Sequence, residues 1–355
     1  MEIINTIIDA FSDSVWPLAF LLYLILGWLL TRPKGGVWSQ FMTALGWPIE
    51  ISQRLSGASS IPYFLILPNF LVFAAFTFAP FFINIGLMVT EGQSINFSDR
   101  PFAGTDNLTR LLAEVNPDTG QENLEDDKFL RAAADTLIFV VFQVPIMIFF
   151  ALCTALALNR KIIGRGFWRA VFFYPVMLSP VVVGFLWTLI LKRQGALSLM
   201  LMQWGMLDEP LQWLQDPSWT MFWSVFVYSW AHLGFYMLIL LAGLQAIPAD
   251  LYEAAEMDGT PPLRQLTRIT LPLLAPTLLV VTVLSLIKAF QAFEELYALN
   301  VRWQSLVAYI FETSGLRGQM TTHGLGIAAT ASLLVAVALI ILSLAQVRLS
   351  GRAAR

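Results

Sequence analysis

The chain has 355 residues, of which 57% are hydrophobic and only 13% charged, and its formal net charge at pH 7 is -3. The charged share is about half of the roughly 25% that is usual in soluble domains. These charges are too few to cover a water-soluble domain of this length, so the composition excludes a soluble globular enzyme.

Seven stretches of the chain contain no Asp, Glu, Lys or Arg and are long enough to cross a membrane as helices. About 20 apolar residues span the roughly 30 Å hydrocarbon core of a bilayer. The stretches are continuous apolar runs, so their backbone hydrogen bonding favours helices over a β-barrel. The predicted fold class is all-α, a polytopic integral membrane protein, with spans at residues 14–31, 55–90, 136–159, 170–191, 217–249, 269–287 and 318–347.

The first predicted span stands apart from the other six. Residues 1–13 hold three carboxylates and no Lys or Arg, so they lack the basic region of a cleavable signal peptide. We expect residues 1–60 to form an extra N-terminal transmembrane helix and a cytoplasmic linker, and residues 61–355 to form a core of six helices. The single cysteine, Cys153, lies inside the third span and is expected to be buried there.

The distribution of Lys and Arg predicts the orientation in the membrane, because positive residues are retained in cytoplasmic loops. Their density in one alternating set of loops is about twice that in the other set. The denser set is predicted to be cytoplasmic, which places the N-terminus outside and the C-terminus in the cytoplasm. The denser set is 31–60, 159–170, 247–271 and 348–355, and the sparser set is 1–15, 91–131, 192–218 and 297–322.

The acidic residues of the periplasmic loop 91–131 suit a solvated surface or a docking surface for an outside partner.

The inner loop 247–271 has a patterned sequence. Pro248 ends the preceding span, Asp250 is a suitable N-cap and Gly259 follows as a stop signal, which predicts a helix of about two turns. Isolated helices shorter than roughly 12 residues are marginal in water. We therefore expect this helix to pack against something outside the bilayer, although an ordinary amphipathic turn is the alternative. One predicted side carries Leu251, Tyr252 and Ala255, and the other carries Asp250, Glu253 and Glu256.

Polar side chains inside the predicted spans form a second group of candidates. Lys288, Gln291 and Glu295 recur at a spacing that places them on one helical face beyond the midplane. Charges at such depth usually face the bundle interior or a wet cavity. The alternative for Lys288 is a side chain that snorkels outward to the membrane surface or that pairs with Glu295 for a purely structural purpose. The alternative for His232, in the fifth span, is a core position in which its hydrogen bonds are satisfied. His232 and His323 are too far apart in sequence to predict a metal site.

The spacing within the inner loop resembles the loop motif of the membrane subunits of binding-protein-dependent ABC importers. Flanking segments, such as Gly164-Arg165-Gly166-Phe167-Trp168-Arg169 and Gly243-Leu244-Gln245, look like the maltose and glycerol-phosphate branch of that family. The resemblance covers about residues 100–347. The motif consists of Glu253-Ala254-Ala255, three residues, Gly259, nine residues, Ile269, one residue, and Leu271-Pro272.

The resemblance implies the type I ABC importer transmembrane fold and a permease subunit for a sugar, either an oligosaccharide or a glycoside, rather than an enzyme. It implies a second homologous permease, two ATPase subunits and a soluble substrate-binding protein as partners in a bacterial or archaeal cytoplasmic membrane. No nucleic-acid partner is expected. The ATPase contact would be carried by Glu253, Ala254, Ala255, Gly259, Ile269, Leu271 and Pro272, and the substrate path by Tyr228, Ser229, His232, Ser285, Lys288, Gln291 and Glu295.

Energy coupling is expected to depend on those partners. The dipeptide Gly-Lys does not occur in the chain, so a Walker A loop is absent. ATP and Mg²⁺ are expected on partner subunits, with no cofactor in this chain. The alternative function, a secondary transporter of a small polar solute, would require internal repeats and no docking loop. The segment after Tyr297 departs from the family's usual Gly-Gly-Pro turn, which leaves the identity of the sugar open.

Overall fold

The computed structural model describes residues 61–92, 94, 96–112, 124–160, 162–315 and 324–353, with a few isolated residues before position 61. This part of the chain is nearly all helical, and its one isolated β-bridge joins Thr90 to Phe102. The all-α prediction is confirmed. The predicted first span 14–31 and the linker up to residue 60 lie almost wholly outside the described residues. The chain divides into two compact units, Met1–Ile83 and Asn84–Arg355.

Six helical segments among the described residues are long and apolar enough to cross a membrane. They correspond to the six predicted spans of the core, although several boundaries shift by a few residues or more. The segments are Ile66–Met88, Lys128–Asn159, Pro180–Gln203, Pro217–Gln245, Pro262–Phe290 and Gly324–Ala345.

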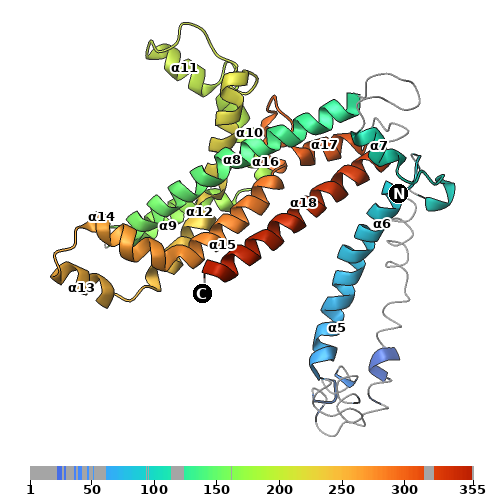
Figure 1. The fold of residues 1–355 in the computed structure, drawn as a ribbon, viewed down its shortest axis with the longest axis horizontal. Helices are drawn as coiled ribbons and strands as arrows, with labels where there is room; N and C mark the ends of the chain where they lie inside the picture. The colour runs from blue at the N-terminus through green and yellow to red at the C-terminus, as the bar shows by residue number, and fades with distance from the viewer. Residues whose placement is uncertain are drawn as a thin grey trace. The chain divides into compact units, whose positions relative to one another are not determined.

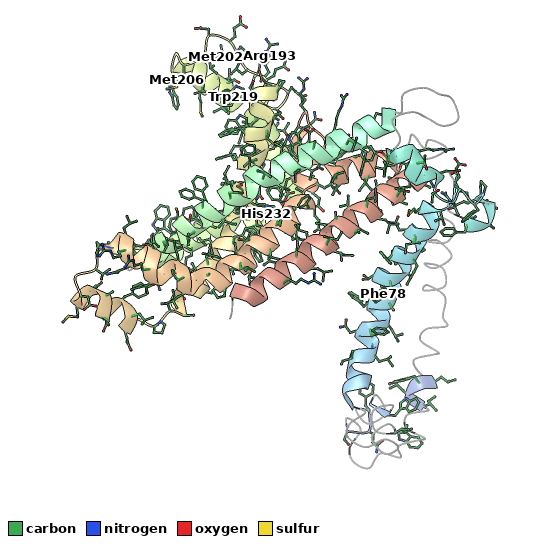
Figure 2. All side chains as sticks on the ribbon, viewed as in Figure 1. Phe78, Arg193, Met202, Met206, Trp219 and His232 are labelled. Atoms are coloured by element: carbon green, nitrogen blue, oxygen red, sulfur yellow. The ribbon has the colours of Figure 1, made fainter. Side chains whose placement is uncertain are left out.

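In the first unit, α5 (Ile61–Phe73) continues through a π-helical turn, η2 (Ala74–Phe78), into α6 (Ala79–Met88), whose last residues belong to the second unit. Large apolar side chains such as Phe76 and Phe82 are exposed along this segment. An all-apolar helix with exposed aromatic rings is suited to hydrocarbon rather than to water. Phe78, in η2, marks this segment in Figure 2.

The second unit is built around α8 (Leu124–Asn159), α12 (Pro217–Gln245) and α15 (Leu271–Phe290), which pack against one another. Met147, Tyr236, Met237 and Leu274 form the centre of this core and are almost fully buried. The last helix, α18 (Gly324–Ala353), packs on α15 and on the short helices α7 (Asp106–Leu112) and α17 (Leu306–Thr313). Figure 1 shows α7 and α17 at one end of this unit.

The predicted span 170–191 is not one continuous helix. The chain forms α9 (Arg165–Phe173), a 3-10 turn at η4 (Tyr174–Met177), and then α10 (Pro180–Leu191) and α11 (Ala196–Gln203). Two prolines explain the break, because Pro175 and Pro180 lack the N–H group that a continuing helix needs. The prediction for Cys153 is also wrong: this side chain lies exposed on α8.

Candidate functional site

The inner loop folds as its pattern predicts, into the two-turn helix α13 (Asp250–Met257). Its end is closed by backbone hydrogen bonds from Gly259 to the carbonyl of Glu256 and from Thr260 to that of Ala255, both at 2.9 Å. Gly259 adopts a φ of 67°, which favours glycine at the end of a helix. Asp250 is the first helical residue rather than the N-cap, and the cap position, Ala249, makes no side-chain hydrogen bond.

Helix α13 is fastened to the following span by its inner face. Ala255 is buried, and the hydroxyl of Tyr252 lies 3.0 Å from Oγ1 of Thr270. The side-chain amide of Gln265 donates to the carbonyl of Thr260 at 3.0 Å. These contacts join the short helix to the base of a membrane span.

The span that follows is one helical column with a local change of winding. It consists of α14 (Pro262–Gln265), a π-helical turn η5 (Leu266–Thr270) and α15. Pro272 cannot donate a helical hydrogen bond, and the N–H of Leu271 reaches the carbonyl of Leu266, five residues back. The later motif positions, Ile269, Leu271 and Pro272, therefore lie within the column and not on α13.

Helix α13 exposes both motif residues and large apolar side chains. Glu253 and Ala254 are exposed, as a contact surface requires. Leu251 and Met257 are also exposed, to 42% and 89%. Leu251 is exposed although it was predicted to share the side of the buried Ala255. Figure 1 shows α13 and α14 at the end of the second unit opposite α7 and α17.

In the middle of the bundle, His232 connects to residues on two elements (Figure 2). Its ring stacks on that of Tyr228 with centroids 4.3 Å apart, and its Nδ1 donates to the carbonyl of Tyr228 at 3.0 Å. Its Nε2 lies 3.4 Å from Oε1 of Glu295, whose side chain is 7% exposed. Because Nδ1 already carries a proton, a hydrogen bond to Glu295 needs a second proton, on Nε2 or on the carboxyl group.

The predicted shared face of Lys288, Gln291 and Glu295 is wrong, because the helix ends before Glu295. Helix α15 stops at Phe290, and a separate helix, α16 (Glu294–Leu299), begins after a short break. The carbonyl of Lys288 accepts a hydrogen bond from the Tyr228 hydroxyl at 2.9 Å. The side chains of Lys288 and Gln291 are exposed, and that of Lys288 forms no ion pair within the described residues.

The seven predicted path residues thus fall into three groups. His232 contacts both Tyr228 and Glu295. Ser229 on α12 and Ser285 on α15 are buried, with 7% and 1% of their surface exposed. Lys288 and Gln291 are exposed. His323 lies outside the described residues. Among the residues that the structure describes, no cluster of three or more His, Cys, Asp or Glu side chains could hold a metal ion.

Two residues that the sequence pattern did not indicate hold α16 in place. A Cβ atom on Gly184 of α10 would lie 2.4 Å from the carbonyl oxygen of Glu295, so only glycine permits this approach. Four residues later, the hydroxyl of Thr188 lies 3.3 Å and 3.2 Å from the carbonyl oxygens of Ala298 and Leu299. A glycine and a threonine one turn apart in a continuous apolar run carry little local signal of such a role.

Comparison with known proteins identifies relatives over most of the chain. Residues 124–355 match the family described as binding-protein-dependent transport system inner membrane component. The lactose transport system permease protein LacF of Rhizobium radiobacter is 32% identical over 236 residues, which are 66% of this chain and 74% of that protein. The trehalose/maltose transport system permease protein MalF of Thermococcus litoralis is 32% identical over 247 residues, 68% and 77% of the two chains.

A solved structure shares the fold. It is a bacterial alginate ABC transporter in complex with an alginate pentasaccharide-bound periplasmic protein. The aligned chain has a TM-score of 0.64 and 24% sequence identity, and the alignment covers 87% of this chain and 97% of that one.

Proposed function

The chain belongs to the family of binding-protein-dependent transport system inner membrane components, and from that premise we propose that it is the permease subunit of an ATP-driven importer for a sugar. It is a multi-pass membrane protein with six described helices of membrane-spanning length. Its relatives include transport permeases named for lactose, for trehalose and maltose, and for arabinooligosaccharides. An oligosaccharide or a glycoside is therefore the proposed substrate class.

The observation that carries this proposal is the exposed, fastened helix α13. Glu253 and Ala254, flanked by Leu251 and Met257, would contact an ATPase subunit, while Tyr252 and Ala255 hold the helix to the span. Two ATPase subunits would bind ATP and Mg²⁺ in this proposal. Their closure would move α13, and the helical column from Pro262 to Phe290 would transmit that motion into the membrane.

The proposed assembly also contains a second, homologous permease and a binding protein that delivers substrate from outside. With α13 on the cytoplasmic side, the N-terminus is outside and the C-terminus inside, in a bacterial or archaeal cytoplasmic membrane. Within it, Tyr228, Ser229, His232, Ser285, Lys288, Gln291 and Glu295 would line the substrate path. Sugar hydroxyl groups need both donors and acceptors, and aromatic rings cover the apolar face of a pyranose, which suits this set of side chains.

The test uses the complex that co-purifies with this chain, reconstituted in proteoliposomes. Loaded binding protein should stimulate ATP hydrolysis and sugar uptake in the wild type. Glu253→Lys should abolish that stimulation while the complex still assembles, because the positive charge replaces the contact carboxylate. Glu256→Lys is the matched control, since Glu256 is exposed on the same helix but lies outside the motif. Unchanged stimulation in Glu253→Lys contradicts the coupling role, and uptake without ATP favours a secondary transporter.

A further inference from the structure

The end of the bundle remote from α13 contains a row of hollows that neither the coupling loop nor the proposed path uses. The first hollow, of about 540 Å³, lies in the loop between α16 and α17, from Leu296 to Glu312. A second, of about 220 Å³, shares Asn300 with it. A third, of about 550 Å³, shares Lys192 and Arg193 with the second. We call this row, from Glu312 past Asn300 to Arg193, the outer groove.

The position of the outer groove follows from the direction of the spans. Helix α12 runs from Pro217 to Gln245 and leads directly into α13, so residues just before Pro217 lie at the opposite end of the bundle. The groove is formed by those residues together with the end of α10 and the loop after α16. In the proposed orientation it therefore opens toward the side from which substrate arrives.

The walls of the groove are held together by hydrogen bonds between its two main loops. The side-chain amide of Gln215 donates to the carbonyl of Asn300 at 2.8 Å. The backbone N–H of Arg302 donates to the carbonyl of Leu214 at 3.2 Å, and its guanidinium donates to the carbonyl of Gln215 at 3.3 Å. Because these hydrogen bonds order the loops before a ligand binds, ordering them costs little binding free energy.

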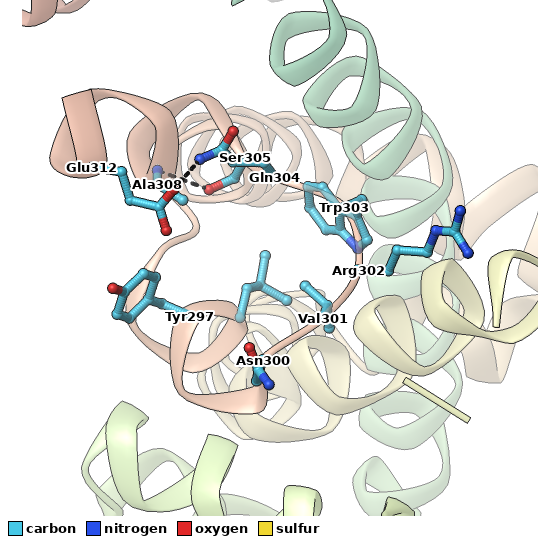
Figure 3. A pocket seen from close by; sticks show the side chains of 10 residues that line it. Tyr297, Asn300, Val301, Arg302, Trp303, Gln304, Ser305, Ala308 and Glu312 are labelled. Carbon is cyan, nitrogen blue, oxygen red and sulfur yellow. Dashed lines mark hydrogen bonds between the residues drawn. The ribbon is translucent and has the colours of Figure 1, made fainter. Parts of the chain in front are cut away.

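The lining favours a ligand that both donates and accepts hydrogen bonds. Figure 3 shows Tyr297, Asn300, Gln304 and Glu312 around the first hollow. Gln304 donates to one carboxylate oxygen of Glu312 at 2.6 Å, which leaves the other oxygen available. The Asn300 side chain has no hydrogen-bond partner in the part of the chain that the structure describes. Amides and carboxylates paired with aromatic rings are suited to the neighbouring hydroxyl groups of sugars.

The volume of the hollows and the side chains that line them further restrict the class of ligand. The first hollow falls within the roughly 300–1,000 Å³ that is usual for small-molecule sites, and the row extends beyond it. The lining carries Lys192, Arg193 and Arg302 as well as Glu312, and the acidic residues Asp208 and Glu209 precede Pro210, which lines the third hollow. This lining of polar and charged side chains around several amides favours a polyhydroxyl chain over a lipid tail.

We propose that the outer groove is a carbohydrate-binding site, separate from the path at His232, which receives one end of an oligosaccharide or glycoside at the outer mouth of the transporter. The proposal rests on the proposed function, because it takes the sugar as the transported solute. In this proposal Asn300, Gln304 and Glu312 form hydrogen bonds with the sugar. The ring of Trp303 forms one wall of the groove; it is 9% exposed and is fixed by a 2.9 Å hydrogen bond to Ser224.

The test measures direct sugar binding to the purified complex in nanodiscs, without binding protein. Lactose, maltotriose and arabinotriose serve as probes, and saturation-transfer NMR with competition gives the affinity. At least one probe should bind to the wild type, and Asn300→Gly combined with Gln304→Ala should weaken it about tenfold or more, the effect of losing roughly 1.4 kcal/mol of hydrogen bonding. Asn300 has a φ of 54°, which glycine adopts freely, so Asn300→Gly removes the amide without straining the loop.

Gln203→Ala is the matched control, because Gln203 is an exposed amide on α11 that lines none of the three hollows. Equal affinity in the wild type and the double variant overturns the groove proposal. So does the absence of sugar binding in a wild-type complex whose ATPase still responds to loaded binding protein, a result that leaves the proposed function intact. A double variant that binds sugar normally but no longer responds to binding protein also overturns it, by assigning the groove to docking. Failure of wild-type stimulation overturns the proposed function itself.

Discussion

Nε2 of His232 lies 3.4 Å from Oε1 of Glu295 and thereby joins α12, which leads to the coupling helix, to α16, which forms part of the outer groove. The Glu295 side chain is almost buried, and the histidine ring is fixed on its other side by Tyr228. The contact therefore links the region that would receive the substrate with the helix that leads to the proposed ATPase contact.

We expect His232→Leu to destabilise the protein, because it leaves Glu295 buried without this partner. Leaving a buried hydrogen-bonding group unsatisfied costs about 1–3 kcal/mol, whereas replacing both partners with apolar groups can be nearly neutral. The double variant His232→Leu/Glu295→Leu should therefore recover much of the loss. Thermal unfolding of the purified complex measures both effects, and additive losses in the double variant would show that the two side chains do not interact.

Gly184→Ala should displace α16, because the added Cβ would lie 2.4 Å from the Glu295 carbonyl oxygen and 2.7 Å from the Ala298 side chain. Overpacking of this kind costs about 1–3 kcal/mol. The measurement is the unfolding temperature together with sugar uptake. Gly166→Ala on α9 is the control, since nothing lies within 4 Å of its Cβ position and alanine favours a helix. Equal effects of the two substitutions would contradict the packing explanation.

Replacement of Gly259 tests whether the end of α13 must adopt a left-handed backbone. The space around its Cβ position is open, so only the φ of 67° opposes a side chain. A branched residue there costs about 1–2 kcal/mol, and asparagine tolerates the conformation better. We expect Gly259→Val to reduce the ATPase stimulation by loaded binding protein several-fold while membrane insertion is unchanged, and Gly259→Asn to retain most of it. Equal stimulation in the two variants would exclude a conformational cause.

Lys288→Met tests the proposed substrate path. The ammonium group is exposed within a span and lacks an ion pair among the described residues, so its removal should leave the fold intact. We expect uptake to fall about tenfold, the effect of one lost charge-assisted contact, while basal ATP hydrolysis is unchanged. Lys288→Arg keeps the charge and should retain more of the uptake. Equal loss of uptake and basal hydrolysis in Lys288→Met would indicate a structural role instead.

Sequence alone determined the membrane-spanning class, six of the spans and the two-turn inner helix. The reason is that each depends on local properties: the length of an apolar run, the position of prolines, and a glycine that ends a helix. The spacing from Glu253 to Pro272 also sufficed to predict the family, because motif offsets are independent of tertiary packing.

Only the tertiary structure decided which polar residues meet. The break at residues 291–293 places Glu295 on a separate helix from Lys288, where it meets His232, 63 positions earlier in the chain. Hydrophobicity could not reveal that break, because α16 is held by contacts with Gly184 and Thr188 on a distant helix. The outer groove likewise requires loops around residues 192, 212 and 300 to converge, which depends on packing between α10, α12 and α16 rather than on any local pattern.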